Sequence, residues 1–114
     1  MANAFKTFTA RDIDTAATGK TTLYTCPAST ETTIIGLNVA NILTSSITVT
    51  VALVDGGGAN PETRIVKDAI VPVGSSLVAV GGDQKIVMNA TDILKIYASA
   101  DNSCDAVLSV LEIS

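Results

Sequence analysis

The sequence contains no histidine and no tryptophan, and its only aromatic residues are two phenylalanines and two tyrosines. Without histidine, no serine or cysteine has the base that most often activates it as a nucleophile, and a zinc site with a histidine ligand is excluded. So few aromatic rings argue against a stacking platform for sugars or single-stranded nucleic acid. These absences predict a protein that is not an enzyme and holds no metal or cofactor.

Charge is also scarce. Charged residues make up 16% of the chain, whereas about 25% is usual. The net charge is -4, and the basic residues are too scattered to neutralise several phosphates together, so we expect no nucleic-acid partner. With 47% hydrophobic residues, we expect neighbouring subunits to cover part of the surface.

No long hydrophobic run is present. No segment approaches the ~18 consecutive apolar residues of a membrane span, and the N-terminal "MANAFKTFTARD" lacks the apolar core of a signal peptide. We therefore expect no membrane partner and synthesis in a cytoplasm. The two cysteines, Cys26 and Cys104, lie in strand-like segments. They fit buried free thiols better than a disulfide, because a reducing cytoplasm opposes disulfide formation.

The chain is rich in β-branched residues. Valine, isoleucine and threonine supply about a third of it, and these types suit a pleated sheet. Eight or nine short β-type runs recur at intervals of roughly ten residues, separated by turn residues. The pattern predicts a single all-β sandwich of about eight short antiparallel strands, and both a jelly-roll and an immunoglobulin-like order fit.

Side-chain alternation indicates which faces are buried. In "ITVTVALV", Ile47, Val49, Val51 and Leu53 face one way and the threonines the other. In "TTIIGLNVAN", we expect one face to carry Ile35, Leu37 and Val39. In the last run, "AVLSVLEI", Val107, Leu111 and Ile113 share a face.

Residues 1–18 differ from the rest and hold both phenylalanines. We predict an N-terminal arm over 1–18 and a β-sandwich domain over 19–114. The arm is either a frayed segment or first strand, or a segment that contacts a neighbouring subunit. In the second case the partner-binding candidates are Phe5, Phe8 and Arg11.

The stretch "TAATGKTT" contains a Gly-Lys-Thr run, as a phosphate-binding loop does. The first glycine of that motif would fall on position 14, which is Asp14, and the segment after Lys20 is a β-type run instead of a helix. The stretch is therefore interpreted as a hinge before the first strand of the domain.

Acidic residues are the remaining candidates for chemistry. Asp83, Asp92, Asp101 and Asp105 lie mostly at turns, where aspartate usually bonds its own backbone. A carboxylate pair for acid–base catalysis and a calcium site at Asp101, Asn102 and Asp105 are the less favoured alternatives.

Two long segments resemble a known class of protein. They are "LYTCPASTETTIIGLNVANI", from Leu23 to Ile42, and "VKDAIVPVGSSLVAVGGDQKIVMNATDILKIYASADNSCDAVLSVLEI", from Val66 to Ile113. Their turns and strand starts resemble those of small virion structural proteins of tailed bacteriophages. The resemblance implies a capsid cement (decoration) protein on the capsid surface, made in the host bacterial cytoplasm. The alternative is a tail- or fibre-associated protein that contributes to attachment at the host surface.

A cement protein of this kind implies two partners. One is the major capsid protein, whose subunits it bridges. The other is the protein itself, in a homo-oligomer. A trimer is favoured, because closed symmetry satisfies repeated sites on three-fold axes.

Overall fold

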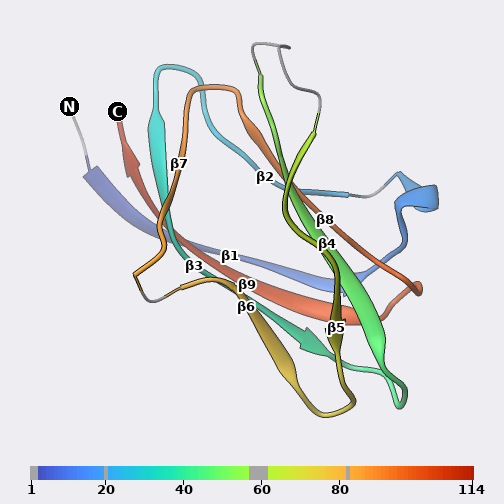
Figure 1. Ribbon diagram of the computed structural model, residues 1–114. Helices are drawn as coiled ribbons and strands as arrows, with labels where there is room; N and C mark the ends of the chain where they lie inside the picture. The colour runs from blue at the N-terminus through green and yellow to red at the C-terminus, as the bar shows by residue number, and fades with distance from the viewer. Residues whose placement is uncertain (1–2, 20, 57–61, 82) are drawn as a thin grey trace.

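The computed structural model describes residues 3–19, 21–56, 62–81 and 83–114. Figure 1 shows this part as strands joined by turns, with one short 3-10 helix, η1 (Ala16–Thr18). No helix in the described ranges is long and apolar enough to cross a membrane. The strands are β1 (Asn3–Ile13), β2 (Thr22–Thr25), β3 (Glu31–Asn41), β4 (Ile47–Val54), β5 (Thr63–Val71), β6 (Ser76–Val80), β7 (Ile86–Met88), β8 (Ile93–Ala98) and β9 (Cys104–Ile113).

These strands form two antiparallel sheets. A five-stranded sheet has the order β1-β9-β3-β6, with β7 also paired to β3, and a four-stranded sheet has the order β2-β8-β4-β5. Strands β6 and β7 pair with opposite ends of β3, β6 along Leu37–Ala40 and β7 along Thr32–Ile34. They therefore act as one interrupted strand, and the predicted all-β sandwich is confirmed.

The strand order is that of a jelly roll. The first strand pairs with the last (β1 with β9), and further pairs follow inward: β2 with β8, β3 with β6 and β7, and β4 with β5. The chain is thus one long antiparallel hairpin rolled into two layers. An immunoglobulin-like sandwich would pair more consecutive strands, whereas among the described strands only β4 and β5 do so.

The core lies between the two sheets. On β4 the predicted inward set is confirmed, because Ile47, Val49 and Val51 are at most 2% exposed and the partly buried Leu53 packs against the core. Thr50 and Ala52, on the other side of the strand, are buried as well. On β9 the core-facing residues are Ala106, Leu108 and Val110. The predicted set of Val107, Leu111 and Ile113 does share a face, but it is the outer one.

On β3 a bulge corrects the predicted face. Ile34 pairs with Val110 on β9, and Gly36 pairs with the next residue, Ser109, so one residue of β3 is extra. An extra residue reverses the alternation on one side of the bulge. Ile34 therefore joins Leu37 and Val39 in the core, whereas Ile35 is only half-buried. The prediction that Ile35 belongs to that face was wrong.

The N-terminal segment forms a strand. β1 runs antiparallel to β9, from Asn3 opposite Ile113 to Ile13 opposite Cys104, and it is the edge of the five-stranded sheet (Figure 1). Of the alternatives for this segment, a first strand describes residues 3–13. The division into an arm over 1–18 and a domain over 19–114 stays a prediction.

The bulge can be tested with two neighbouring substitutions. We expect Ile34→Ala to lower the free energy of unfolding by ~2–5 kcal/mol, because it empties a fully buried site. Ile35→Ala should cost about 1 kcal/mol or less, because its side chain already meets solvent. Urea denaturation of both variants measures the difference, and equal losses would contradict the bulged register.

Candidate assembly interface

The outer face of the five-stranded sheet carries exposed apolar side chains in register. Phe5 on β1, Leu111 on β9, Thr33 on β3 and Val87 on β7 lie directly opposite one another and form one row across four strands. Phe5 is 78% exposed and Val87 is 59% exposed. A phenylalanine and a valine this exposed in one row make this surface the candidate interaction site of the molecule.

A second row runs parallel to the first. It joins Thr9, Val107, Asn38 and Val78 across β1, β9, β3 and β6, and both of its valines are exposed. The charged residues paired on this face, Glu31 and Asp105, are opposite Ile113 and Ala40 at its two ends. The middle of the face is therefore apolar or neutral, and we call the two rows together the apolar face.

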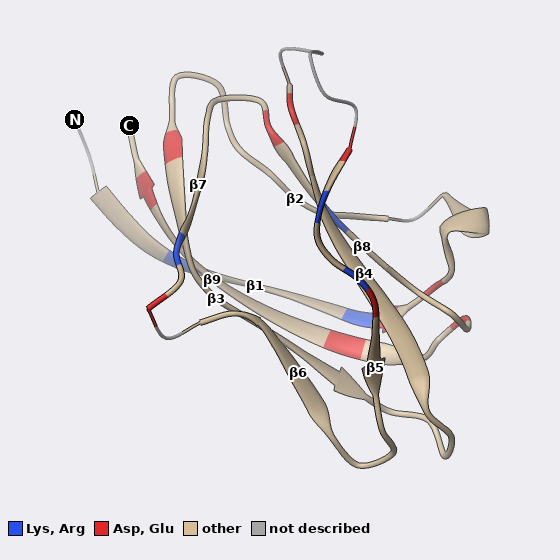
Figure 2. Cartoon of the chain, in the orientation of Figure 1, with Lys and Arg blue, Asp and Glu red and all other residues tan. Residues whose placement is uncertain are grey.

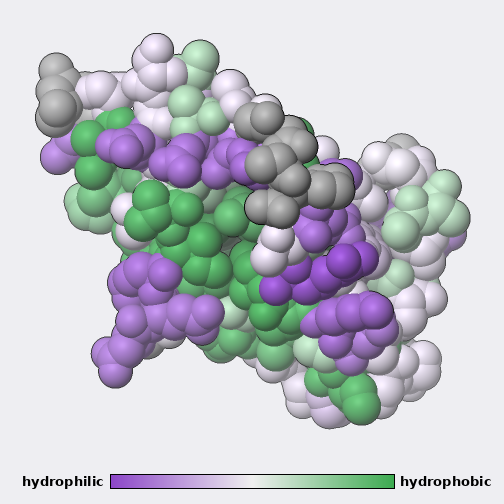
Figure 3. Space-filling model, turned by 45° about the horizontal axis from the view of Figure 1, so that its top comes forward, coloured by the Kyte–Doolittle hydropathy of each residue, from purple (hydrophilic) through white to green (hydrophobic). Residues whose placement is uncertain are grey.

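A cleft adjoins the apolar face. Strands β5 and β7 end the two sheets on the same side of the sandwich and pair only inward, with β4 and β3. The cleft there, of about 270 Å³, is lined by Leu53, Asp55, Thr63, Val87, Asn89 and Asp92. Figure 3 shows hydrophobic residues gathered in the middle of one side of the molecule, with hydrophilic residues around them.

The outer face of the four-stranded sheet is different. Figure 2 shows basic residues on β5 and β8 of this sheet. Arg64 pairs with Glu62 at 3.0 Å, and the hydroxyl of Tyr97 donates to the same carboxylate at 3.2 Å. Ile70, near the end of β5, is an exposed apolar exception. The two outer faces thus differ in chemistry, and among the described strands only those of the first face carry exposed apolar rows.

The structure separates the predicted partner-binding residues. Phe5 lies on the apolar face. Phe8 faces inward, with its ring centroid 4.8 Å from that of Tyr24 on the other sheet. Arg11 is exposed on β1, beside the irregularity between Ala10 and Ile13. The sequence did not signal Val78 and Val87 as part of this surface, because only the strand register brings them next to β1 and β9.

A polar cluster holds β1 and the two sheets together. The Glu112 carboxylate on β9 receives the Lys6 ammonium from β1 at 2.8 Å and the Tyr24 hydroxyl from β2 at 2.6 Å. The Tyr24 oxygen also lies 2.8 Å from the Thr32 hydroxyl on β3. Glu112 is only 7% exposed, so these partners replace the water that a buried carboxylate loses.

The cluster shifts two pKa values in opposite directions. The hydrogen bonds from Lys6 and then Tyr24 lower the pKa of Glu112, so the carboxylate stays charged. Burial, together with the adjacent Glu112, raises the pKa of Tyr24, so its hydroxyl stays a donor. We call this cluster of Glu112, Lys6, Tyr24 and Thr32 the clamp, because it holds β9, β1, β2 and β3 together.

Three aspartates near one end of β1 accept hydrogen bonds from backbone groups that are distant in the sequence. Asp101 accepts from the backbone N–H and the hydroxyl of Thr15, each at 3.0 Å, and these bonds lower its pKa. Asp105 accepts from the N–H of Asp12 at 3.0 Å. The Asp14 carboxylate accepts from the N–H of Asn102 at 2.9 Å. These bonds attach the end of β1 to β9 and to the turn between β8 and β9. For Asp101 and Asp105 the sequence predicted bonds to their own local backbone, and the bonds found here are long-range instead.

Asp92 also has a turn role. Its carboxylate accepts from the N–H groups of Asn89 and Gly56, each at 2.9 Å. A side chain at Gly56 would meet the Thr91 backbone, so glycine permits this close approach. Over the described ranges, no three acidic or cysteine side chains are grouped so as to hold a metal ion.

The other sequence candidates have local explanations. Gly19 has a φ of +76° and ends η1, and β2 begins at Thr22, so a strand follows where a phosphate-binding loop needs a helix. Lys20 lies outside the described residues. Cys26 and Cys104 are free and buried, as interpreted from the sequence.

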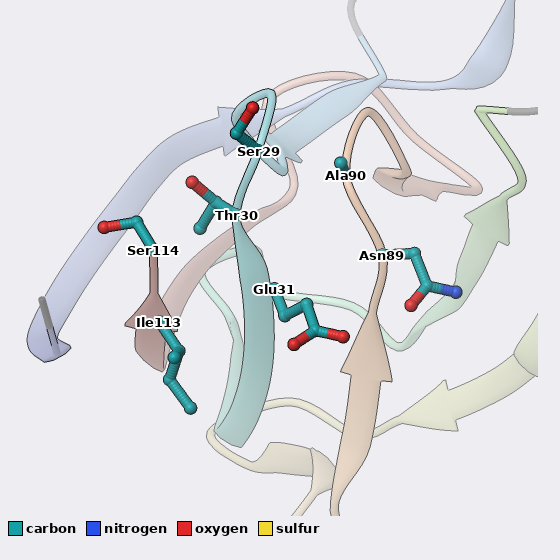
Figure 4. A pocket seen from close by; sticks show the side chains of 7 residues that line it. All are labelled: Ser29, Thr30, Glu31, Asn89, Ala90, Ile113 and Ser114. Atoms are coloured by element: carbon teal, nitrogen blue, oxygen red, sulfur yellow. The ribbon is translucent and has the colours of Figure 1, made fainter. Parts of the chain in front are cut away.

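A second pocket, of about 420 Å³, lies at the end of the sandwich near the β2–β3 and β7–β8 turns. Its lining consists of Ser29, Thr30, Glu31, Asn89, Ala90, Ile113 and Ser114. Figure 4 shows that these side chains do not converge on one point. Among the described residues of the lining, Glu31 is the only acidic side chain.

Solved structures of other proteins have a similar fold. The chain is similar to a subunit of Bacillus endospore appendages, described as a family of disulfide-linked pili. The TM-score is 0.56 at 15% identity, over 99% of this chain and 87% of that one. It is also similar to a protein of the infectious bursal disease virus particle, with a TM-score of 0.55 at 15% identity, covering 96% of this chain and 30% of that one.

A further structure, of the Gx strain of infectious bursal disease virus, has a TM-score of 0.50 at 16% identity and covers 98% of this chain and 33% of that one. The chain thus spans about a third of the virus proteins and most of the appendage subunit. No protein-family model and no curated protein matches the sequence. At these identities the similarity shows the fold alone.

The clamp predicts acid sensitivity. Because the pKa of Glu112 is lower in the folded state, its contribution is fully present above the unfolded pKa of about 4.3 and is lost as pH falls through the folded pKa. We expect Glu112→Gln to lower the free energy of unfolding at pH 7 by ~1–3 kcal/mol and to flatten its decline below pH ~5.

Urea denaturation between pH 3 and pH 7 measures both effects. Glu31→Gln, at an exposed carboxylate on the neighbouring strand, is the matched control and should keep the wild-type pH dependence. An acid decline in Glu112→Gln as steep as that of the wild type would contradict the clamp.

Proposed function

We propose that the protein is a non-enzymatic structural protein of a bacteriophage virion. In the most concrete form it is a capsid cement protein that oligomerises, as a trimer, and stabilises the shell by bridging capsomers. The apolar face carries the proposal. It is built on a rigid sheet, as an assembly surface requires. Its exposed apolar side chains would be removed from water by a bound partner; they are Phe5, Val78, Val87 and Val107.

The fold supports an assembly role. Jelly rolls are common in viral capsid proteins, and the solved structures similar to this chain include a virus particle and a pilus. The resemblance of the Leu23–Ile42 and Val66–Ile113 segments to tailed-phage virion proteins adds the phage setting. Fold similarity by itself is an analogy, so the chemistry of the surface has to supply the mechanism.

The mechanism is burial repeated over a shell. A stable interface hides ~1,600 Å² in total, and its apolar part contributes roughly 25 cal/mol per Å² before association costs are subtracted. Phe5, as an exposed aromatic residue, has the character of an interface anchor. Because one subunit bridges several capsomers, modest contacts add through effective concentration. Phe8 and Arg11 remain secondary candidates for this contact.

The assembly that we propose is non-covalent. The pilus subunit with a similar fold is described as disulfide-linked. In this sequence Cys26 is 1% exposed and Cys104 is 0% exposed, and burial raises the pKa of Cys104, which keeps it a thiol. Neither sulfur is accessible to another subunit.

One alternative has its own support. The chain covers 87% of the pilus subunit, so its size and fold also suit a filament or a tail- or fibre-associated virion protein that contributes to host-surface attachment. Such a protein would repeat along an axis and would bind tails.

A co-sedimentation experiment separates the two. The purified protein is mixed with expanded capsids, with unexpanded capsids and with tails of the phage that encodes it. Recovery with capsids is the expected result, and recovery with tails alone would replace the cement role by the tail role. Light scattering on the free protein tests the trimer.

Two matched substitutions test the apolar face. We expect Phe5→Ser to weaken capsid binding by about 30-fold, the equivalent of ~2 kcal/mol at an anchor residue. Ile70→Ser removes a similarly exposed side chain from the other sheet and should leave binding unchanged. Binding isotherms on capsids measure both variants, and an effect of Ile70→Ser equal to that of Phe5→Ser would overturn the assignment of the face.

A further inference from the structure

We propose that β1 is exchanged between copies of the chain, so that in the assembled protein each β1 pairs with β9 of a neighbouring subunit. The inference deepens the proposed assembly role and rests on it. It names a second copy of this chain as the first partner, and residues 3–15 as the exchanged segment. Three features of the structure lead to it.

The first feature is where β1 is attached. Among the described strands it pairs only with β9, and the bonds at and beyond its end go to the turn just before β9 and to Ala98, the last residue of β8. The N–H of Ser103 donates to the carbonyl of Ile13 at 3.0 Å, and the N–H of Asn102 donates to the Asp14 carboxylate at 2.9 Å. Most partners of the segment therefore belong to one continuous stretch, residues 98–113, which a second copy would present unchanged.

The second feature is the excess length of the connection between β1 and β2. The carbonyls of Asp14 and Thr21 accept from the N–H groups of Ala98 and Ile96, at 3.0 Å and 2.8 Å. Ala98 and Ile96 are two residues apart on β8, about 7 Å along a strand. The chain from Asp14 to Thr21 makes seven residue steps and reaches about 24 Å when extended. The connection is thus much longer than closure within one subunit requires.

The third feature is the structure of the loop that takes up this excess length. η1 has no buried residue, and the N–H groups of Thr18 and Gly19 bond carbonyls within the same loop, those of Thr15 and Ala16. Figure 1 shows η1 standing away from both sheets. Gly19, at a φ of +76°, lets the backbone turn there. Extending the loop therefore breaks short-range backbone bonds and leaves the core intact.

Exchange conserves the contacts that hold β1. Lys6 would still bond a Glu112, and Phe8 would still pack on a Tyr24, but in the neighbouring subunit. Because the same contacts form in either state, protein concentration and ring closure decide between them, and such exchange is a low-cost route to closed oligomers. A cyclic exchange among three copies would give the proposed trimer.

Engineered disulfides distinguish the two states. Thr7 and Ser109 lie directly opposite each other on β1 and β9, where Cβ atoms are about 4.5–5.5 Å apart, close to disulfide spacing. The test variant is Thr7→Cys with Ser109→Cys, and Thr9→Cys with Val107→Cys is an independent second pair. The control variant is Asn38→Cys with Val107→Cys, on β3 and β9, which stay in one chain in either state.

The oligomer isolated by gel filtration is oxidised and run on a denaturing gel without reductant. We expect the β1–β9 pairs to link chains into covalent multimers, and the β3–β9 pair to give single chains. Single chains from both β1–β9 pairs, or a protein that is monomeric at all concentrations, would overturn the exchange. A monomer that still co-sediments with capsids would overturn the exchange alone. An exchanged oligomer that binds neither capsids nor tails would overturn the proposed virion role alone.

Discussion

The buried Glu112 carboxylate is the contact on which the arrangement of strands depends at one end of the sandwich. It joins β9 to β1 through Lys6 and to the opposite sheet through Tyr24. A charge with this little exposure is tolerated only when hydrogen bonds replace its hydration, so β1 and β2 must both be in place. The clamp links the correct position of the edge strand to the stability of the core.

This dependence has a consequence for the surface. Lys6 and Phe8 face inward from β1, and Phe5, on the same strand, faces outward. The inward contacts fix the strand, and a fixed strand holds Phe5 in the row with Leu111 and Val87. The apolar face is therefore only as rigid as the clamp on the other side of the same strand.

Sequence reasoning recovered what local periodicity determines. The alternation on β4, the turn residues between strands and the β-branched composition were sufficient to predict the two-layer sandwich. The bulge at Ile34 and Gly36 was not predictable, because its register is set by pairing with β9, whose residues are more than 70 positions away. The jelly-roll order could not be predicted from the sequence either, since both candidate orders use the same short strands and differ only in long-range pairing.

The candidate surface was predictable only in part, for the same reason. Phe5 stood out because phenylalanine is rare in this chain, and rarity is a local signal. Val78, Val87 and Val107 resemble the core valines in sequence, and only the register places them outside. The sandwich thus has one outer face with exposed apolar rows and one with charged residues, and the apolar face is the one for which we propose a partner. An edge strand attached through a long connection allows copies of the chain to exchange β1, which joins subunits and leaves the apolar face of each one exposed to a further partner.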